Sequence, residues 1–90
     1  MKFNFEILKQ FLNHKFTAEL PNSHVVGGRS IGRVRDKQDC VVQCYHSDQC
    51  GAVDYEIPLS ICWFHSPHTA CGTKASLPRV IHVSLMHCGG

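Results

Sequence analysis

Six cysteines in a chain of 90 residues constrain this fold more than any other feature of the sequence. They fall within the last 51 residues, at positions Cys40, Cys44, Cys50, Cys62, Cys71 and Cys88. A domain this short buries little apolar surface, and small exported domains compensate with disulfides. Three bridges of roughly 2–4 kcal/mol each would be comparable to the whole stability of a domain. We therefore expect an oxidising compartment, with zinc ligation or free thiols as the alternative.

The remaining composition is typical of one folded domain. Apolar residues make up 43% of the chain and charged residues 18%, whereas disordered segments are poor in apolar residues and heavily charged. No apolar run reaches the roughly 18–20 residues needed to cross a bilayer, so we expect no membrane span. The net charge of +2 gives no bulk argument for binding to nucleic acid.

The N-terminal segment stands apart from the cysteine-containing part. Residues 1–6 lack the apolar core and the cleavage site of a signal peptide, so we expect an added Met1 or a fragment cut from a larger chain. The apolar spacing of residues 3–12 fits both a helix and a strand. We expect residues 1–14 to be an N-terminal extension and residues 15–90 a single domain. The extension either packs on that domain or mediates homo-oligomerisation.

Short extended segments and one helix are expected over the rest of the chain. The extended segments are residues 15–20, 24–26, 29–35, 52–57, 61–65 and 79–86. Residues 21–23 are predicted to form a turn and residues 66–78 a long loop. Asp36 is predicted to cap a helix over residues 37–47, with Asp39 three residues on as in a capping box. One helix among several strands indicates an α+β fold.

The cysteine spacing around the predicted helix is that of a known module. Residues 39–50 (DCVVQCYHSDQC) have the pattern Cys-x3-Cys-x5-Cys, followed by a predicted strand with Tyr55 and then by Cys62 and Phe64. Over roughly residues 15–88 the chain resembles the PAN/apple domain family. The resemblance implies one helix packed on a curled antiparallel β-sheet of about five strands, stapled by disulfides. It also implies an extracellular module that recognises proteins or carbohydrates.

The resemblance also implies a disulfide pairing, one of the fifteen connectivities that six cysteines allow. The family pairing gives the bridges Cys40–Cys62 and Cys44–Cys50. The chain departs from apple domains because it has no cysteine near its start to pair with one near its end. It has Cys71 instead, and we expect Cys71 to pair with Cys88. This departure puts in doubt any family contact that depends on a tethered N-terminus.

The implied pairing assigns the two faces of the sheet, because side chains alternate along a strand. With Cys62 toward the helix, the helix-facing set is Val53, Tyr55, Ile57, Phe64, Ile81, Val83 and Leu85. The opposite face holds Ala52, Asp54, Glu56, Trp63 and His65. We expect Asp54 and Glu56 to be solvated surface. An outward Trp63 is covered by the N-terminal segment, is an aromatic platform for a sugar ring or a partner, or is simply partly exposed.

A basic stripe is the second candidate for ligand binding. Arg29, Arg33 and Arg35 share one face if residues 29–35 form a strand, and they could bind sulfate or carboxylate groups through bidentate hydrogen bonds. The alternative is a solvated edge that prevents edge-to-edge pairing. The candidate ligand-binding residues are therefore Trp63, His65, Arg29, Arg33 and Arg35.

Catalytic and metal signatures are weak. The chain has no Gly-x-Ser-x-Gly elbow, His-Glu-x-x-His motif or phosphate loop, so we expect neither an enzyme nor a cofactor. The alternative metal site is the set Cys62, His65, His68 and Cys71, whose thiolates and imidazoles are zinc ligands. Pro67 prevents the helix that would gather them.

The sequence thus predicts a secreted, non-catalytic module that recognises a glycan or glycoprotein. The alternative is a protein-interaction or self-assembly module of an adhesion or matrix protein. A zinc-stabilised module is the third possibility.

Overall fold

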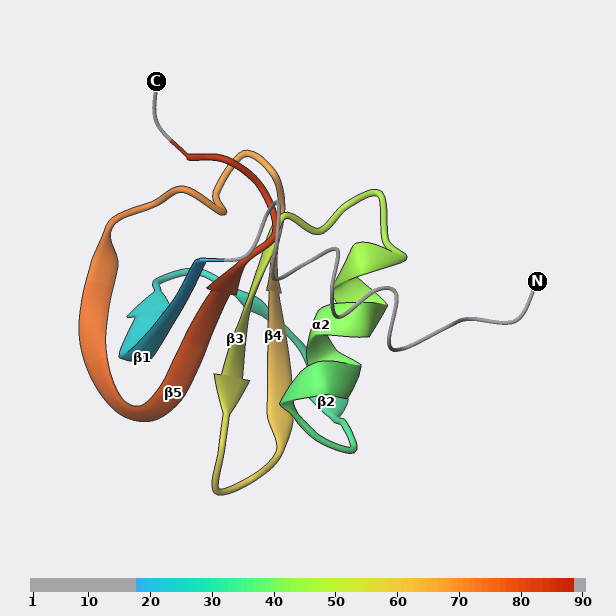
Figure 1. Cartoon of the computed structure of the whole chain (residues 1–90), viewed down its shortest axis with the longest axis vertical. Coiled ribbons are helices and arrows are strands. Elements are labelled where there is room, and N and C mark those ends of the chain that lie inside the picture. The colour runs from blue at the N-terminus through green and yellow to red at the C-terminus, as the bar shows by residue number, and fades with distance from the viewer. Residues whose placement is uncertain (1–17, 89–90) are drawn as a thin grey trace.

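The computed structural model describes residues 18–88, so the expectations for the extension at residues 1–14 and for residues 3–12 lie outside the described residues. The elements in chain order are β1 (Ala18–Val25), β2 (Arg29–Arg33), α2 (Lys37–Tyr45), β3 (Ala52–Glu56), β4 (Ile61–His65) and β5 (Lys74–Ser84). All neighbouring strands are antiparallel and form one open sheet in the order β1-β5-β3-β4-β2 (Figure 1). The α+β expectation is confirmed.

Local side-chain hydrogen bonds fix the start of α2. Asp36 is the N-cap, and its Oδ1 accepts a hydrogen bond from the Asp39 backbone N–H at 2.8 Å. The Asp39 carboxylate in turn accepts from the Arg35 backbone N–H at 2.9 Å, and this bond holds the pKa of Asp39 below its ordinary value. The predicted cap is confirmed, with the return bond one residue before the position of a standard capping box.

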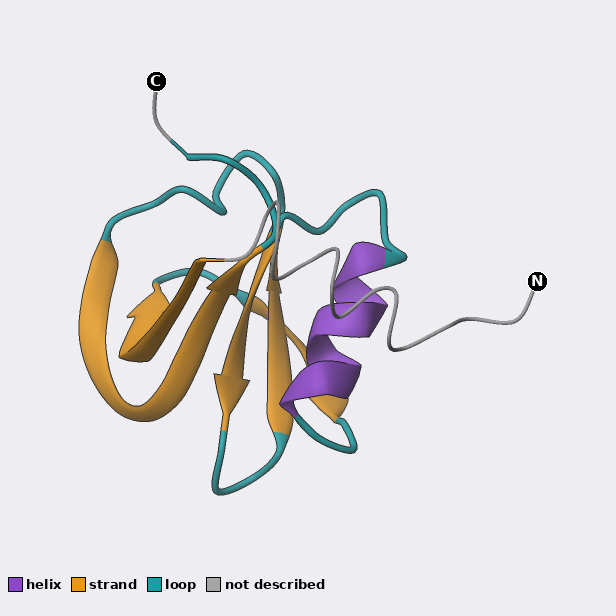
Figure 2. Ribbon diagram, in the orientation of Figure 1, coloured by secondary structure: helices purple, strands orange, loops and turns teal. Residues whose placement is uncertain are grey.

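The core lies between α2 and one face of the sheet (Figure 2). Helix residues meet strand residues there, among them Cys40, Val41, Cys44, Val53, Tyr55, Cys62, Phe64 and Val83. Ile57 was expected in this set, but it follows the end of β3 and is 47% exposed. Among the described residues, no helix has the length and apolar character needed to cross a membrane.

Three disulfides hold the elements together. Cys40–Cys62 joins α2 to β4, and Cys44–Cys50 ties the end of α2 to the segment that leads into β3. Cys71–Cys88 joins the β4–β5 loop to the segment after β5. All three expected pairs are present, and no cysteine is left free.

Strands β1 and β5 are longer than predicted. The turn expected at residues 21–23 is wrong: β1 runs through it, with Asn22 in the left-handed region at φ 51°. The register jumps there from Pro21↔Ile81 to Ser23↔Ser76, so one residue of β1 lies opposite four residues of β5. Because β5 begins at Lys74, the loop expected over residues 66–78 is also shorter than predicted.

The bulge of β5 curls the sheet. Residues 77–80 are the four that lack a one-to-one partner on β1, and an insertion of this kind bends a strand and increases its twist. Figure 1 shows β5 turning back on itself and carrying β1 over the sheet face that is remote from α2. This face is therefore concave and partly enclosed, which positions the site described next.

Candidate functional site

Asp54, His65 and His82 meet at the centre of the concave face. They come from the adjacent strands β3, β4 and β5. Asp54 on β3 is the direct cross-strand partner of His82 on β5 and of Trp63 on β4. His65 follows Trp63 by two residues on β4, so it lies on the same face as Trp63. Since cross-strand partners share a face, all three side chains point to the same side. Their exposed fractions are 5% or less.

The Asp54 carboxylate is the hub of this cluster. Its Oδ2 lies 2.5 Å from His65 Nε2 and its Oδ1 lies 2.7 Å from His82 Nδ1. The Val25 backbone N–H donates a third hydrogen bond to Oδ2 at 3.2 Å. Burial raises the pKa of Asp54, but the hydrogen bonds from His65 and His82 outweigh it and keep this pKa below its ordinary value. Asp54 is therefore ionised at neutral pH.

The cluster is not fully hydrogen-bonded. The far ring nitrogens, His65 Nδ1 and His82 Nε2, are buried and have no hydrogen-bond partner in the described part of the chain. Buried polar atoms in proteins are nearly always paired, because an unpaired one carries the full cost of its desolvation. Two unpaired nitrogens in one buried cluster therefore need an explanation beyond structural support.

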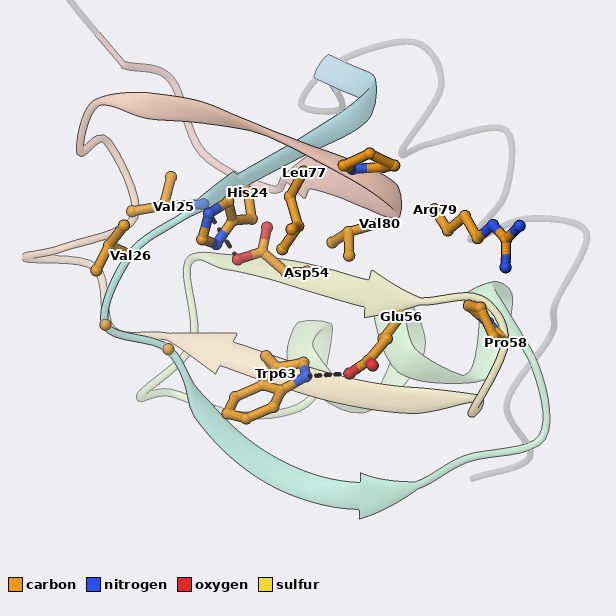
Figure 3. Close-up of a pocket in the computed structure, with 13 residues that line it drawn as sticks. His24, Val25, Val26, Asp54, Glu56, Pro58, Trp63, Leu77, Arg79 and Val80 are labelled. Carbon is orange, nitrogen blue, oxygen red and sulfur yellow. Dashed lines mark hydrogen bonds between the residues drawn. The ribbon is translucent and has the colours of Figure 1, made fainter.

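A pocket of about 400 Å³ lies directly beside the cluster. Residues 24–28 and the β5 bulge at residues 77–80 contribute its walls, and Asp54, Glu56 and Trp63 contribute from β3 and β4. Figure 3 shows the Trp63 ring and the Glu56 carboxylate side by side, and Trp63 Nε1 donates a hydrogen bond to Glu56 Oε1 at 3.3 Å. The pocket thus combines an oriented aromatic ring, a fixed carboxylate and apolar walls.

The wall formed by residues 24–28 is attached to the cluster. The Val25 backbone N–H donates a hydrogen bond to Asp54, and Gly28 lies against His65 and Trp63 of β4. A Cβ at Gly28 would lie 2.9 Å from His65 Cε1 and 3.3 Å from Trp63 Cβ, so only glycine allows this approach without displacement. The cluster therefore fixes one side of the pocket.

The sequence placed most of these residues on the correct face but misjudged their burial. Trp63 is partly exposed and lines the pocket, on the face expected for it. Asp54 was expected to be solvated and His65 to face outward, but they are only 4% and 1% exposed. The curl of β5 and β1 over this face is the reason. His82 was missed, although its place between Ile81 and Val83 already assigns it to this face.

The expected basic stripe does not form on one face. The pairing of β2 with β4 shifts between Ser30 and Gly32, so Arg29 lies opposite Phe64 and Arg33 opposite Ile61. Phe64 and Ile61 are three residues apart on one strand and point to opposite faces. Arg35 lies beyond the end of β2. All three arginines are exposed, and none of them lines the pocket.

The alternative zinc set of Cys62, His65, His68 and Cys71 is also wrong. Both thiols are consumed in disulfides, Cys62 with Cys40 and Cys71 with Cys88. His65 is bound to Asp54, and His68 is exposed on the loop before β5.

Comparison of the chain with protein-family models, with curated proteins and with solved structures finds no match in any of the three. The resemblance to the PAN/apple family thus rests on the cysteine spacing, and inferences about function rest on the site.

Proposed function

We propose that this chain is an extracellular, non-catalytic recognition module of the PAN/apple type that binds a glycan in the concave pocket. One observation carries the proposal: Trp63 is partly exposed and lines the pocket beside the carboxylate of Glu56. The Trp63 indole N–H donates a hydrogen bond to this carboxylate and holds it in place. A sugar ring has an apolar C–H face, which stacks on an aromatic ring, and hydroxyl groups, which donate to a carboxylate.

The other walls of the pocket fit this ligand chemistry. Val26 and Leu77, which line the pocket, are exposed apolar side chains, 71% and 39% accessible. His24 and Arg79 add polar groups at the margin. A volume of about 400 Å³ lies toward the small end of the roughly 300–1,000 Å³ typical of ligand sites. We therefore expect a terminal sugar unit to bind rather than a long chain.

The three disulfides support an extracellular setting, because such bridges persist in oxidising compartments. A pocket of this size on a small module gives modest affinity for one sugar unit. Several copies presented together would bind more tightly, since the second binding event becomes effectively intramolecular.

A glycan array probed with the wild type and with single-residue variants tests the proposal. Trp63→Ala removes the stacking surface, and we expect it to abolish binding to the glycans that the wild type retains. Leu59→Ala is the matched control, because Leu59 is 48% exposed on the β3–β4 turn and does not line the pocket. The proposal is wrong if the wild type binds no glycan, or if Trp63→Ala binds as well as Leu59→Ala.

A further inference from the structure

Three metal-binding side chains converge beneath the pocket. One donor atom from each of Asp54, His65 and His82 lies within 4.8 Å of the donor atoms of the other two. The three residues sit on adjacent strands of one sheet, so the backbone holds the donors in place. Their burial keeps bulk water from competing for the site. The cluster is thus a preorganised set of three ligands.

The unpaired nitrogens show that hydrogen bonds within residues 18–88 do not satisfy the whole cluster. A purely structural network is stabilising when every buried member is satisfied, and a partly satisfied network costs free energy. Here His65 Nδ1 and His82 Nε2 have no partner within residues 18–88. An ion at the centre would contact the opposite ring nitrogens, His65 Nε2 and His82 Nδ1, so its binding energy must outweigh this cost rather than remove it.

We propose that Asp54, His65 and His82 form a zinc-binding site at the base of the concave pocket. Two imidazole nitrogens and one carboxylate oxygen are a donor set that zinc takes when three protein ligands leave one position open. Calcium and magnesium prefer oxygen ligands throughout, so the two imidazoles disfavour them. This proposal does not depend on glycan binding.

The geometry requires only small side-chain adjustments. Zinc lies about 2.0–2.2 Å from nitrogen and oxygen ligands, so two ligands of one ion are at most about 4.4 Å apart. The 2.5 Å contact from His65 Nε2 and the 2.7 Å contact from His82 Nδ1 to Asp54 must lengthen as the ion enters between the donors. On binding, each imidazole ligates through the nitrogen that faces Asp54 and carries its proton on the far nitrogen, His65 Nδ1 or His82 Nε2.

The surroundings favour a cation at this position. The Val25 N–H orients the carboxylate of Asp54 from outside the site, as hydrogen bonds to metal ligands commonly do. Asp54 is ionised, and Glu56 adds a second carboxylate to the same pocket. Because Asp54 itself lines the pocket, water or a ligand oxygen from the pocket could complete the shell of a bound ion.

Zinc stoichiometry in matched variants tests the site. After incubation with zinc chloride and desalting, native mass spectrometry of the wild type should show one retained zinc per chain. We expect Asp54→Asn, His65→Gln and His82→Gln to lose this zinc. Asp48→Asn and His68→Gln change the same residue types at exposed positions and should keep it. A wild type without retained zinc, or control variants that lose it equally, would overturn the proposal.

A second measurement avoids the risk that buried-site variants fail to fold. Anomalous diffraction at the zinc edge, on wild-type crystals grown with zinc, locates every bound ion. A peak between Asp54, His65 and His82 supports the proposal. No peak there, including the case in which zinc lies only at exposed histidines, overturns it.

Discussion

At the scale of single residues, Asp54 connects the fold to the site. It accepts hydrogen bonds from strands β4 and β5 and from the end of β1, so one carboxylate joins three parts of the curled sheet. The same side chain forms part of the pocket. A change at Asp54 should therefore affect stability and pocket geometry together.

Asp54→Asn should destabilise the protein by about 3 kcal/mol at neutral pH, because it leaves buried partners without their charge. The folded-state pKa of Asp54 lies below its unfolded value of about 3.9. The stabilisation is therefore fully present above that unfolded pKa and is lost as the pH falls through the folded pKa. Urea denaturation from pH 7 to pH 2 measures this.

The exposed Asp48→Asn variant is the control for this titration, and we expect it to change stability by less than about 0.5 kcal/mol. The ionised Asp54 would not have the stabilising role assigned to it if Asp54→Asn matched Asp48→Asn in two respects. These are the free energy of unfolding at pH 7 and the steepness with which that free energy falls below pH 4.

At the scale of elements, the sequence predicts features that depend on neighbouring residues, but it does not predict features that depend on the pairing of distant strands. The cap of α2 depends on residues three apart, and strands β3 and β4 on simple alternation, so the sequence predicted all of them. The extent of β1 and β5 depends on a bulge opposite Asn22, which arises only when the two strands pair. The enclosure of the concave face follows from that bulge, and so does the burial of Asp54 and His65.

The N-cap of α2 provides a prediction at this scale. Asp36→Ala should lower the free energy of unfolding by about 1 kcal/mol, because the Asp39 N–H loses its acceptor. Asp36→Asn should retain most of the stability, since asparagine caps helices about as well as aspartate. Chemical denaturation of both variants measures the difference, and equal losses would show that the charge rather than the cap matters.

At the scale of the whole molecule, the three disulfides differ in what they hold. Cys40 and Cys62 are fully buried in the core, whereas Cys71 and Cys88 are exposed and join a loop to the segment after β5. The first pair therefore supports the packing of α2 on the sheet. The second pair limits the conformational freedom of the unfolded chain and holds the β4–β5 loop to the segment after β5.

Replacing Cys71 and Cys88 together with serine should cost about 2–4 kcal/mol and leave a cooperatively folded protein. The same double replacement at Cys40 and Cys62 should cost more or prevent folding, because it also puts polar hydroxyls into the core. Urea denaturation followed by circular dichroism compares the two, and a larger loss at Cys71 and Cys88 would reverse this ranking.

The most direct test of recognition in the concave pocket uses the chain's single tryptophan, Trp63, which lines that pocket. Its fluorescence is titrated with methyl glycosides of hexoses, N-acetylhexosamines and sialic acid, with acrylamide quenching measured at each step. We predict a saturable change in emission and reduced quenching for at least one sugar. A wild type whose emission and quenching stay constant with every sugar would contradict glycan recognition at this site.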